Sequence, residues 1–272
     1  MGNVVSGNRF DGIFLYESHC NNIAGNNIYE NGGDGIHLKY SSNNNIADND
    51  IHENSGYSIF FKYSDAGNVI NNNIWGNSYH GVSLFWCSRI DILNNNISDN
   101  SGRGVSLYYS SSNNIENNSI CENDYGIYFY GESISNSVKN NNICRNNCGI
   151  YLYYEAGNNI VFLNNFIDNS VCSDHANNIW NSTSKIAYTY GGEGYESYMG
   201  NYWSDYAGSD ADGDGIGDSP YDIDENDRDY HPLIVPWENY FQPTPTPVPE
   251  FAGVALVVAA LAAMLLALKK LM

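Results

Sequence analysis

Positive charge is scarce in this chain of 272 residues, which has 11 lysines and arginines against 31 aspartates and glutamates and a formal net charge of −20. A protein that binds nucleic acid through its phosphates needs clustered positive charge, so this class of function is excluded. Charged residues of both signs make up only 15% of the chain, too few for a disordered segment expanded by its own charge. The polarity comes instead from 43 asparagines, accompanied by 23 tyrosines and 26 glycines. Asparagine favours turns over helices, which argues against an ordinary helical or α/β enzyme.

A repeat of 23 residues organises the first two thirds of the chain. One file of asparagines recurs at this period: Asn26, Asn49, Asn72, Asn95, Asn118, Asn141 and Asn164. A second file follows five positions later: Asn31, Asn54, Asn77, Asn100, Asn123, Asn146 and Asn169. Two apolar files, which begin at Ile23 and Ile28, keep the same period. A fixed period of this length is typical of architectures in which neighbouring repeats stack.

Each repeat also contains a short segment of the form Gly-Ile-x-Leu, as in Gly35-Ile36-His37-Leu38. Its alternation has a period of two, which is typical of a strand, so each repeat holds three short strands with apolar side chains facing a common axis. Stacking such units about 4.8 Å apart predicts an all-β parallel β-helix in which like asparagines hydrogen-bond along the stack. A leucine-rich-repeat fold is the alternative for this period, but the asparagine-rich stretches would not form its helical return.

Beyond Asn169 the period fades, and residues 200–233 carry further motifs. The segment Gly200-Asn201-Tyr202-Trp203-Ser204-Asp205-Tyr206 is followed by Asp229-Tyr230-His231-Pro232-Leu233. Together with the asparagine-rich coils, these segments resemble the NosD-type right-handed parallel β-helix proteins, in the form common on archaeal cell surfaces. The resemblance covers about residues 3–235. It implies the fold, and a family that groups copper-associated and carbohydrate-associated members.

The C-terminal residues indicate a stalk and a membrane tail. The proline-rich residues 243–249 form an extended spacer, and residues 251–268 contain no charge before Lys269 and Lys270. This pattern predicts a single transmembrane helix with its C-terminus in the cytoplasm and the β-helix outside. Pro249-Glu250-Phe251 with the following span resembles the archaeal PEF-CTERM sorting signal, which implies the membrane and an archaeosortase as partners. No secretory signal opens the sequence, so we expect the natural chain to start further upstream.

The expected division of the chain follows from these features. It is 1–180 for the β-helix repeats, 181–240 for an acidic C-terminal cap, 241–250 for the stalk and 251–272 for the transmembrane tail.

An acidic loop at residues 210–218 has the spacing of calcium ligands. The expected ligands are the carboxylates of Asp210, Asp212, Asp214 and Asp218 and the backbone carbonyl of Ile216. Tyr221 stands where an EF-hand has its bidentate glutamate, so Asp222 or Asp224 would have to complete the shell. Carboxylates this close repel one another unless a cation lies between them. We predict a structural Ca²⁺ that clamps the cap over the open end of the β-helix, and a solvated acidic loop is the alternative.

Aromatic residues form files on the expected outer face. Four residues after each glycine of Gly-Ile-x-Leu stand Tyr16, Lys39, Lys62, Phe85, Tyr108, Tyr130 and Tyr153, and aromatic residues are frequent two and five residues after it. A ribbed aromatic surface suits the stacking of sugar rings, with tyrosine hydroxyls as hydrogen-bonding groups. We therefore expect envelope polysaccharide as a partner. The predicted contacts are Tyr16, Phe85, Tyr108, Tyr130 and Tyr153, and the alternative is that the rings only stabilise neighbouring strands.

The sequence also offers an enzymatic and a copper-handling interpretation. Asp34, His80 and Arg103 share the file before the glycine and could act as acid, base and clamp in a polysaccharide lyase, hydrolase or epimerase, although exposed polar turn residues are the alternative. The six histidines share no file, and copper needs convergent imidazole or soft sulfur ligands, so copper is not the expected cofactor. A structural or adhesive surface protein is therefore the first interpretation, a carbohydrate-active enzyme the second and a copper-handling factor the third.

Cysteine spacing suggests one disulfide. Cys121 and Cys144 are 23 residues apart and would lie on adjacent coils, within disulfide reach. Cys148 and Cys172 are 24 residues apart and form a looser second possibility, and reduced structural thiols are the alternative for both pairs.

Overall fold

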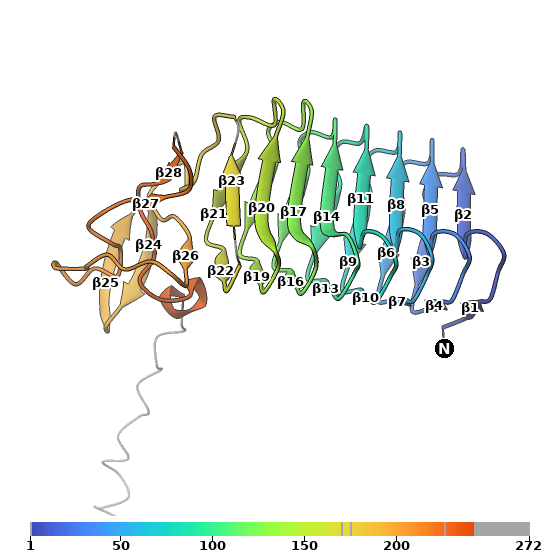
Figure 1. Ribbon diagram of the computed structural model, residues 1–272, viewed down its shortest axis with the longest axis horizontal. Helices are drawn as coiled ribbons and strands as arrows, with labels where there is room; N and C mark the ends of the chain where they lie inside the picture. Colours follow the sequence, from blue (N-terminus) through green and yellow to red (C-terminus); the bar gives the residue numbers. More distant parts are fainter. Residues whose placement is uncertain (1, 170, 175, 226, 242–272) are drawn as a thin grey trace, which may run out of the picture. The chain divides into compact units, whose positions relative to one another are not determined.

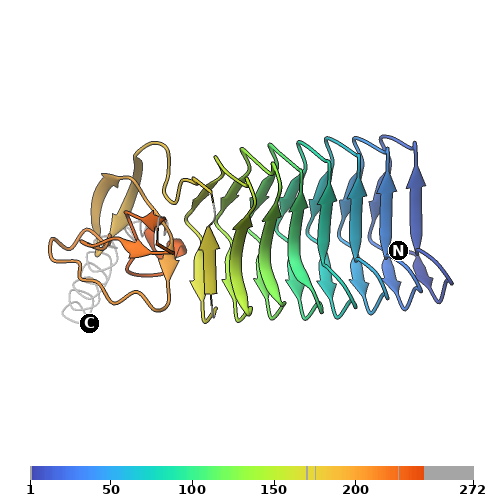
Figure 2. The same ribbon diagram turned by 45° about the horizontal axis from the view of Figure 1, so that its top comes forward.

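The computed structural model describes residues 2–169, 171–174, 176–225 and 227–241, and those up to Tyr240 form one compact unit. Most of this unit is a parallel β-helix whose coils follow one another along a single axis (Figures 1 and 2). The coils contribute short strands to three parallel sheets, named here sheets A, B and C. The all-β parallel β-helix predicted from the 23-residue repeat is thus confirmed.

The strands of the three sheets are listed here in chain order. Sheet A contains β1 (Val4–Ser6), β4 (Asn27–Tyr29), β7 (Asp50–His52), β10 (Asn73–Trp75), β13 (Asn96–Ser98), β16 (Ser119–Cys121), β19 (Asn142–Cys144), β22 (Asn165–Ile167) and β26 (Tyr202–Trp203). Sheet B contains β2 (Ile13–Tyr16), β5 (Ile36–Lys39), β8 (Ile59–Lys62), β11 (Val82–Phe85), β14 (Arg103–Tyr108), β17 (Tyr125–Tyr130), β20 (Cys148–Tyr153) and β23 (Val171–Asp174). Sheet C contains β3 (Asn22–Ala24), β6 (Asn45–Ala47), β9 (Asn68–Ile70), β12 (Asp91–Leu93), β15 (Asn114–Glu116), β18 (Ser137–Lys139) and β21 (Ile160–Phe162).

The register of the sheets follows the 23-residue period. In sheet A, Ile74 pairs with Ile51 on one side and with Ile97 on the other. Near Gly126 the repeat is one residue shorter, but the strand pairing continues, because Val105 of β14 pairs with Ile127 of β17, 22 residues further on. Like positions of successive repeats therefore lie side by side, one strand apart.

The interior of the coils is filled by apolar side chains from all three sheets. Ile28 of sheet A, Leu38 of sheet B and Ile46 of sheet C are fully buried, and the same positions in the next coils repeat this pattern. Full burial of one such side chain stabilises the fold by about 1.5–3 kcal/mol. A single coil has no opposite layer to cover this apolar surface, so the repeats are stable only when they are stacked.

Every coil turns at residues with positive φ, and most of these are followed directly by an asparagine or serine that hydrogen-bonds to a neighbouring coil. In one coil the residues with positive φ are Tyr40, Asn43, Asp48 and Glu53. The stacking residues directly after them are Ser41, Asn44, Asn49 and Asn54. Positive φ is uncommon for residues other than glycine, so these turns need compensating interactions.

The asparagine files supply these interactions as hydrogen-bonded ladders. The side-chain oxygen of Asn95 accepts both the backbone N–H of Asn72, at 2.8 Å, and its Nδ2, at 3.0 Å. The Nδ2 of Asn72 also donates to the carbonyl of Ile46 in the preceding coil, at 2.9 Å. Each buried amide thus joins three coils, and the stacking predicted for the asparagines is confirmed.

The cap replaces the next coil at the C-terminal end. It contains the hairpins β24 (Ile186–Tyr190)–β25 (Glu193–Ser197) and β27 (Tyr221–Asp222)–β28 (Arg228–Asp229) and the short 3-10 helix η1 (Trp237–Tyr240). Its strand β26 pairs with β22 and so extends sheet A of the β-helix. A small second core of the cap includes Tyr188, Met199 and Leu233.

A buried carboxylate ends one of the asparagine ladders. Asn201 takes the next place after Asn164, although it lies 37 residues further on, and its Oδ1 accepts the Asn164 Nδ2 at 2.9 Å. Asp229 then accepts the Asn201 backbone N–H at 2.6 Å and the Trp203 Nε1–H at 3.0 Å. This carboxylate is fully buried, and its burial raises the pKa of Asp229 to about 6. The motifs around residues 200–203 and 229 are therefore the terminus of the ladder.

The cysteines and the expected tail can be placed as follows. Cys121 and Cys144 form a disulfide between the adjacent strands β16 and β19. Cys148 is a buried free thiol that lies opposite Val171, so the backbone register does not pair it with Cys172. Within the described residues, no helix has the length and apolar character needed to cross a membrane. The expected stalk at 243–249 and span at 251–272 lie outside those residues.

The ladder predicts a sharp contrast between two neighbouring asparagines. Asn95→Ala should lower the free energy of unfolding by about 3–5 kcal/mol, because it leaves several buried donors and acceptors of adjacent coils without partners, at about 1–3 kcal/mol each. Asn96→Ala is the matched control, since Asn96 is exposed and its amide bonds only the Asn73 side chain. Chemical denaturation followed by circular dichroism measures both variants, and equal losses would contradict the role of the ladder.

Candidate functional site

The outer face of sheet B presents four side-chain files, at positions one before and two, four and five after the glycine of each coil. Strands β2 to β20 lie side by side along this face (Figure 1). Its exposed aromatic side chains are Phe14, Tyr16, Tyr40, Tyr63, Trp86, Tyr153 and Tyr154. We call this surface the sheet B face. It carries nearly half of the large apolar side chains that are exposed in the described part of the chain.

The rings on this face contact one another from coil to coil. Tyr40 and Tyr63 are stacked with ring centres 5.2 Å apart. Trp86 and Tyr109 are stacked in the same way at 4.8 Å. Perpendicular pairs, such as Tyr63 with Phe85, interrupt these stacks.

The five predicted sugar contacts all lie on the sheet B face, but their exposure differs. Tyr16 is 51% exposed and Tyr153 is 40% exposed, whereas Phe85, Tyr108 and Tyr130 are half-buried. The file five residues after the glycine was not among the predicted contacts, yet its Trp86 is 50% exposed. Its members stand at turns with positive φ, which the alternation within the strand does not reveal.

Three cations of this face lie over aromatic rings. Lys39 is 5.8 Å from the ring centre of Tyr16, and Lys62 is 5.3 Å from that of Phe85. Arg103 lies 3.6 Å above the ring of Tyr128. Among the described residues, none of the three forms an ion pair with a carboxylate.

One polar cluster lies near the N-terminal end of the sheet B face. His37 Nδ1 is 3.3 Å from a carboxylate oxygen of Asp11 and 3.3 Å from one of Asp34. Burial raises the pKa of Asp34 to about 6, the Asp11 charge adds to this rise, and a hydrogen bond from the Tyr57 backbone opposes it. Burial lowers the pKa of His37, against the attraction of Asp11. Asp34 and His37 are thus an acid–base pair in contact.

A second polar cluster lies near the middle of the face. The Arg103 guanidinium is 3.2 Å from His80 Nε2 and donates to the Tyr108 hydroxyl. Burial, with the charge of Arg103, lowers the pKa of His80 to about 3, so this imidazole is neutral at pH 7. The structure brings His80 and Arg103 together, but it places Asp34 with Asp11 and His37, two coils away. The three residues of the alternative, enzymatic interpretation are therefore divided between two clusters.

The acidic loop brings three of its four predicted carboxylates together. Asp210, Asp212 and Asp214 each offer an oxygen within 4.8 Å of the others. Burial, backed by the charges of the neighbouring carboxylates, raises the pKa of Asp214. Asp218 instead accepts hydrogen bonds from the Ser209 hydroxyl, at 2.9 Å, and from the Ala211 backbone, at 2.8 Å. Ile216 is buried in the core of the cap.

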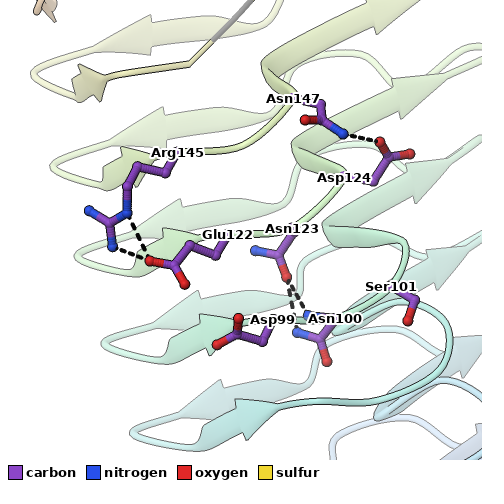
Figure 3. A pocket seen from close by; sticks show the side chains of 8 residues that line it. All are labelled: Asp99, Asn100, Ser101, Glu122, Asn123, Asp124, Arg145 and Asn147. Carbon is purple, nitrogen blue, oxygen red and sulfur yellow. Dashed lines mark hydrogen bonds and ion pairs between the residues drawn. The ribbon is translucent and has the colours of Figure 1, made fainter.

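A shallow polar hollow lies at the turns between sheets A and B (Figure 3). The side chains in it bind one another: Arg145 bonds Glu122, and Asn147 donates to Asp124 at 3.0 Å. Asn123 belongs to an asparagine ladder and accepts from Asn100. Most of the side chains that line this hollow thus hold successive turns together.

Comparison with known proteins identifies the family. The family described as "Periplasmic copper-binding protein (NosD)" matches residues 1–147 and 54–208. The chain belongs to the NosD family. A search of curated proteins found no match to this NosD-family chain.

One solved structure shows the same fold. The A-module of the Azotobacter vinelandii mannuronan C-5 epimerase AlgE6 superposes with a TM-score of 0.58 and 14% identity, over 65% of this chain and 52% of that module. A mutant of the periplasmic alginate epimerase AlgG gives a TM-score of 0.49 and 17% identity, over 64% of this chain and 42% of that protein. The chain thus spans about half the length of these proteins, and at this identity the similarity concerns the fold alone.

The described residues do not offer a donor set suited to copper, which the family description names. Two groups of three or more His, Cys, Asp or Glu residues approach closely enough to share a metal ion, around Asp34 and around Asp212. Together they contain one histidine and no cysteine, whereas copper sites use convergent imidazole or sulfur ligands. Oxygen-rich groups of this kind suit hard cations such as Ca²⁺.

Asp34 predicts a measurable pH dependence of stability. On folding, the pKa of Asp34 is raised from 3.8 to about 6. The stability that the protonated Asp34 contributes to the folded state is therefore fully present below pH 3.8 and is lost as the pH rises through 6. Asp34→Asn keeps the acceptor for the Tyr57 N–H but cannot ionise. The free energy of unfolding of this variant should therefore fall less between pH 4 and pH 7 than that of the unaltered chain. Denaturation curves at both pH values measure the difference, and identical slopes would refute the assignment.

Proposed function

We propose that this chain is an envelope protein whose sheet B face binds polysaccharide. The observation that carries this proposal is the set of exposed aromatic side chains along one face of the β-helix. A large exposed apolar surface is unfavourable in water and is typical of an interaction site. Stabilisation of neighbouring strands does not by itself require that Trp86 be 50% exposed and Tyr154 52% exposed.

The shape and chemistry of the face favour a long, polar, ring-containing ligand. The aromatic files run across successive coils, so they present repeating contacts about 4.8 Å apart along the axis. Tyrosine rings combine an apolar surface with a hydroxyl, which is the combination that sugar rings match. The half-buried Tyr108 and Tyr130 would then supply hydroxyl contacts, while Trp86 and Tyr16 supply exposed rings.

An extracytoplasmic location agrees with the covalent chemistry of the chain. The Cys121–Cys144 disulfide persists in oxidising compartments and is rare in the cytosol. The family description also names periplasmic proteins. We propose attachment to the membrane through residues 251–272, with the sorting segment from Pro249 as the substrate of an archaeosortase-type enzyme.

A carbohydrate-active enzyme is the second candidate, and the contact between Asp34 and His37 favours it. A carboxyl group with a pKa of about 6 can give and take a proton near neutral pH, as acid–base catalysis requires. Release of new reducing ends or of unsaturated sugars from a polysaccharide substrate would support this candidate. Loss of that activity in Asp34→Asn, with unchanged binding, would assign it to this pair.

A structural Ca²⁺ in the acidic loop is a further part of the proposal. Three carboxylates within 4.8 Å of one another repel strongly unless a cation lies between them. The loop is tied to the hairpin β24–β25, because Tyr188 donates to the Asp214 carbonyl at 3.0 Å and Tyr195 to the Gly213 carbonyl at 3.1 Å. A cation that holds the loop would therefore stabilise the whole cap.

Binding to sugars should depend on Trp86. Trp86→Ala should weaken the binding of an envelope polysaccharide by up to about tenfold, since a stacked aromatic contact contributes about 0.5–1.5 kcal/mol beyond the area it buries. Trp75→Ala is the matched control, because Trp75 is also a stacked indole but lies on sheet A. Affinity electrophoresis or calorimetry measures both variants. Equal binding by both would argue that the rings only stabilise the strands.

Calcium should raise the melting temperature of the chain. At a concentration one hundred times its dissociation constant, a bound ligand stabilises the folded state by about 2.7 kcal/mol. Asp212→Asn should abolish most of this gain, whereas Asp99→Asn, an exposed change in a β-helix turn outside the acidic loop, should retain it. Thermal melts with calcium and with a chelator test this, and calorimetry without calcium uptake would disprove the site.

A further inference from the structure

Arg103 is held across strand β14 by contacts that are not ion pairs. It begins at one edge of the sheet B face and reaches the hydroxyl of Tyr108, five residues further along the same strand. The residue between them on this face, Ser106, is small and buried, which leaves space for the long side chain to cross. The guanidinium lies over the ring of Tyr128, so the stack fixes its plane.

His80 presents a donor, not an acceptor, to this guanidinium. The backbone N–H of Arg103 donates to His80 Nδ1 at 3.1 Å. Since the imidazole is neutral, its single proton must then be on Nε2. This Nε2–H lies 3.2 Å from a nitrogen of the Arg103 guanidinium, which also carries only donors. Two donors thus meet without an acceptor between them.

The tyrosines around this contact add further donors. The Tyr108 hydroxyl accepts from Arg103, and burial raises its pKa, so it keeps a proton to donate. The rings of Tyr57 and Tyr79 pack against His80, with centres 5.2 Å and 4.0 Å from the imidazole. Burial raises the pKa of Tyr57, which therefore also remains a donor.

Among the described residues, no carboxylate pairs with Arg103 or His80, and within this cluster Asp34 reaches only the backbone N–H of the neighbouring Tyr57. On strands β8, β11 and β14 and the turns beside them, the outward files contain Tyr57, Phe60, Lys62, Tyr63, His80, Ser83, Phe85, Trp86, Arg103, Ser106, Tyr108 and Tyr109. Elsewhere in the described part of the chain, Arg89, Lys139, Arg145 and Arg228 each pair with a carboxylate. In a chain of net charge −20, this stretch of the sheet B face, with Lys62 and Arg103 and without acids in its outward files, is a local exception.

We propose that Arg103, His80 and Tyr108 form a subsite for the oxyanion of an acidic sugar, a uronate carboxylate or a sulfate ester. This inference rests on the proposed binding of polysaccharide to the sheet B face and names the class of sugar. An oxyanion can accept hydrogen bonds from the guanidinium, from His80 Nε2–H and from the Tyr108 hydroxyl together. It would thus supply the acceptor that the donors of Arg103 and His80 lack. Charge-assisted hydrogen bonds of this kind are roughly twice as strong as neutral ones.

The test compares three oligosaccharides of equal length by calorimetry with the full chain. They are an oligouronate, its carboxyl-reduced neutral counterpart and a sulfated derivative of that counterpart. The unaltered chain should bind at least one acidic form about tenfold or more tightly than the neutral form, and the two acidic forms distinguish a carboxylate from a sulfate. Arg103→Gln should lose this preference but still bind the neutral form through the aromatic files.

Arg145→Gln is the matched control, because Arg145 is paired with Glu122 outside the sheet B face and its loss should leave the preference intact. Circular dichroism and a thermal melt show whether each variant is folded. Equal binding of neutral and acidic forms, or an undiminished preference in folded Arg103→Gln, would overturn the subsite while leaving the proposed function in place. Absence of binding to any form would overturn both. If Arg103→Gln fails to fold, Arg103→Lys replaces it. The lysine ammonium is a point charge that cannot form two parallel hydrogen bonds to an oxyanion or stack on the Tyr128 ring as the guanidinium does, so this variant should keep only part of the preference for acidic sugars.

Discussion

The structure depends on one hydrogen-bonding constraint, the stacking of asparagine amides at the turns. A turn residue with positive φ exposes backbone groups inside the stack, and the asparagine that follows it satisfies them. Its oxygen accepts two donors from the preceding coil, and its nitrogen donates both to a carbonyl of that preceding coil and to the oxygen of the next asparagine in the file. Because each amide needs a like amide above and below, a coil is stable only in register with its neighbours.

This constraint also shapes the surface. Once the register is fixed, residues of the same repeat position form continuous files. Each file can therefore present the same type of side chain over several coils. The sheet B face uses this to align aromatic rings, three cations without carboxylate partners and two titratable clusters. The other sheets carry different files, such as the asparagines and aspartates of sheet A, so the faces of one β-helix differ in their surface chemistry.

The same constraint explains the cap. A ladder that stopped at Asn164 would leave buried amide groups without partners, and water cannot reach them there. Asn201 continues the ladder, and Asp229 ends it with a carboxylate that accepts from Asn201 and Trp203. The cap thus closes the hydrogen-bonding network as well as the apolar core, and the acidic loop around Asp212 is attached to the same unit through the tyrosines of its hairpin.

The sequence by itself determined the repeat, the three strands in each coil, the inward apolar files and the asparagine ladders, because each of these follows from a period that is local and regular. It also placed Cys121 beside Cys144 and the aromatic residues on one face. Only the tertiary structure decided that Asp34 lies with His37 while His80 lies with Arg103, since these contacts depend on side-chain conformations between coils. The role of Asp229 could not be predicted either. In this ladder the 23-residue period ends after Asn164, and no spacing in the sequence shows that Asn201 is the next residue of the ladder or that Asp229 follows it.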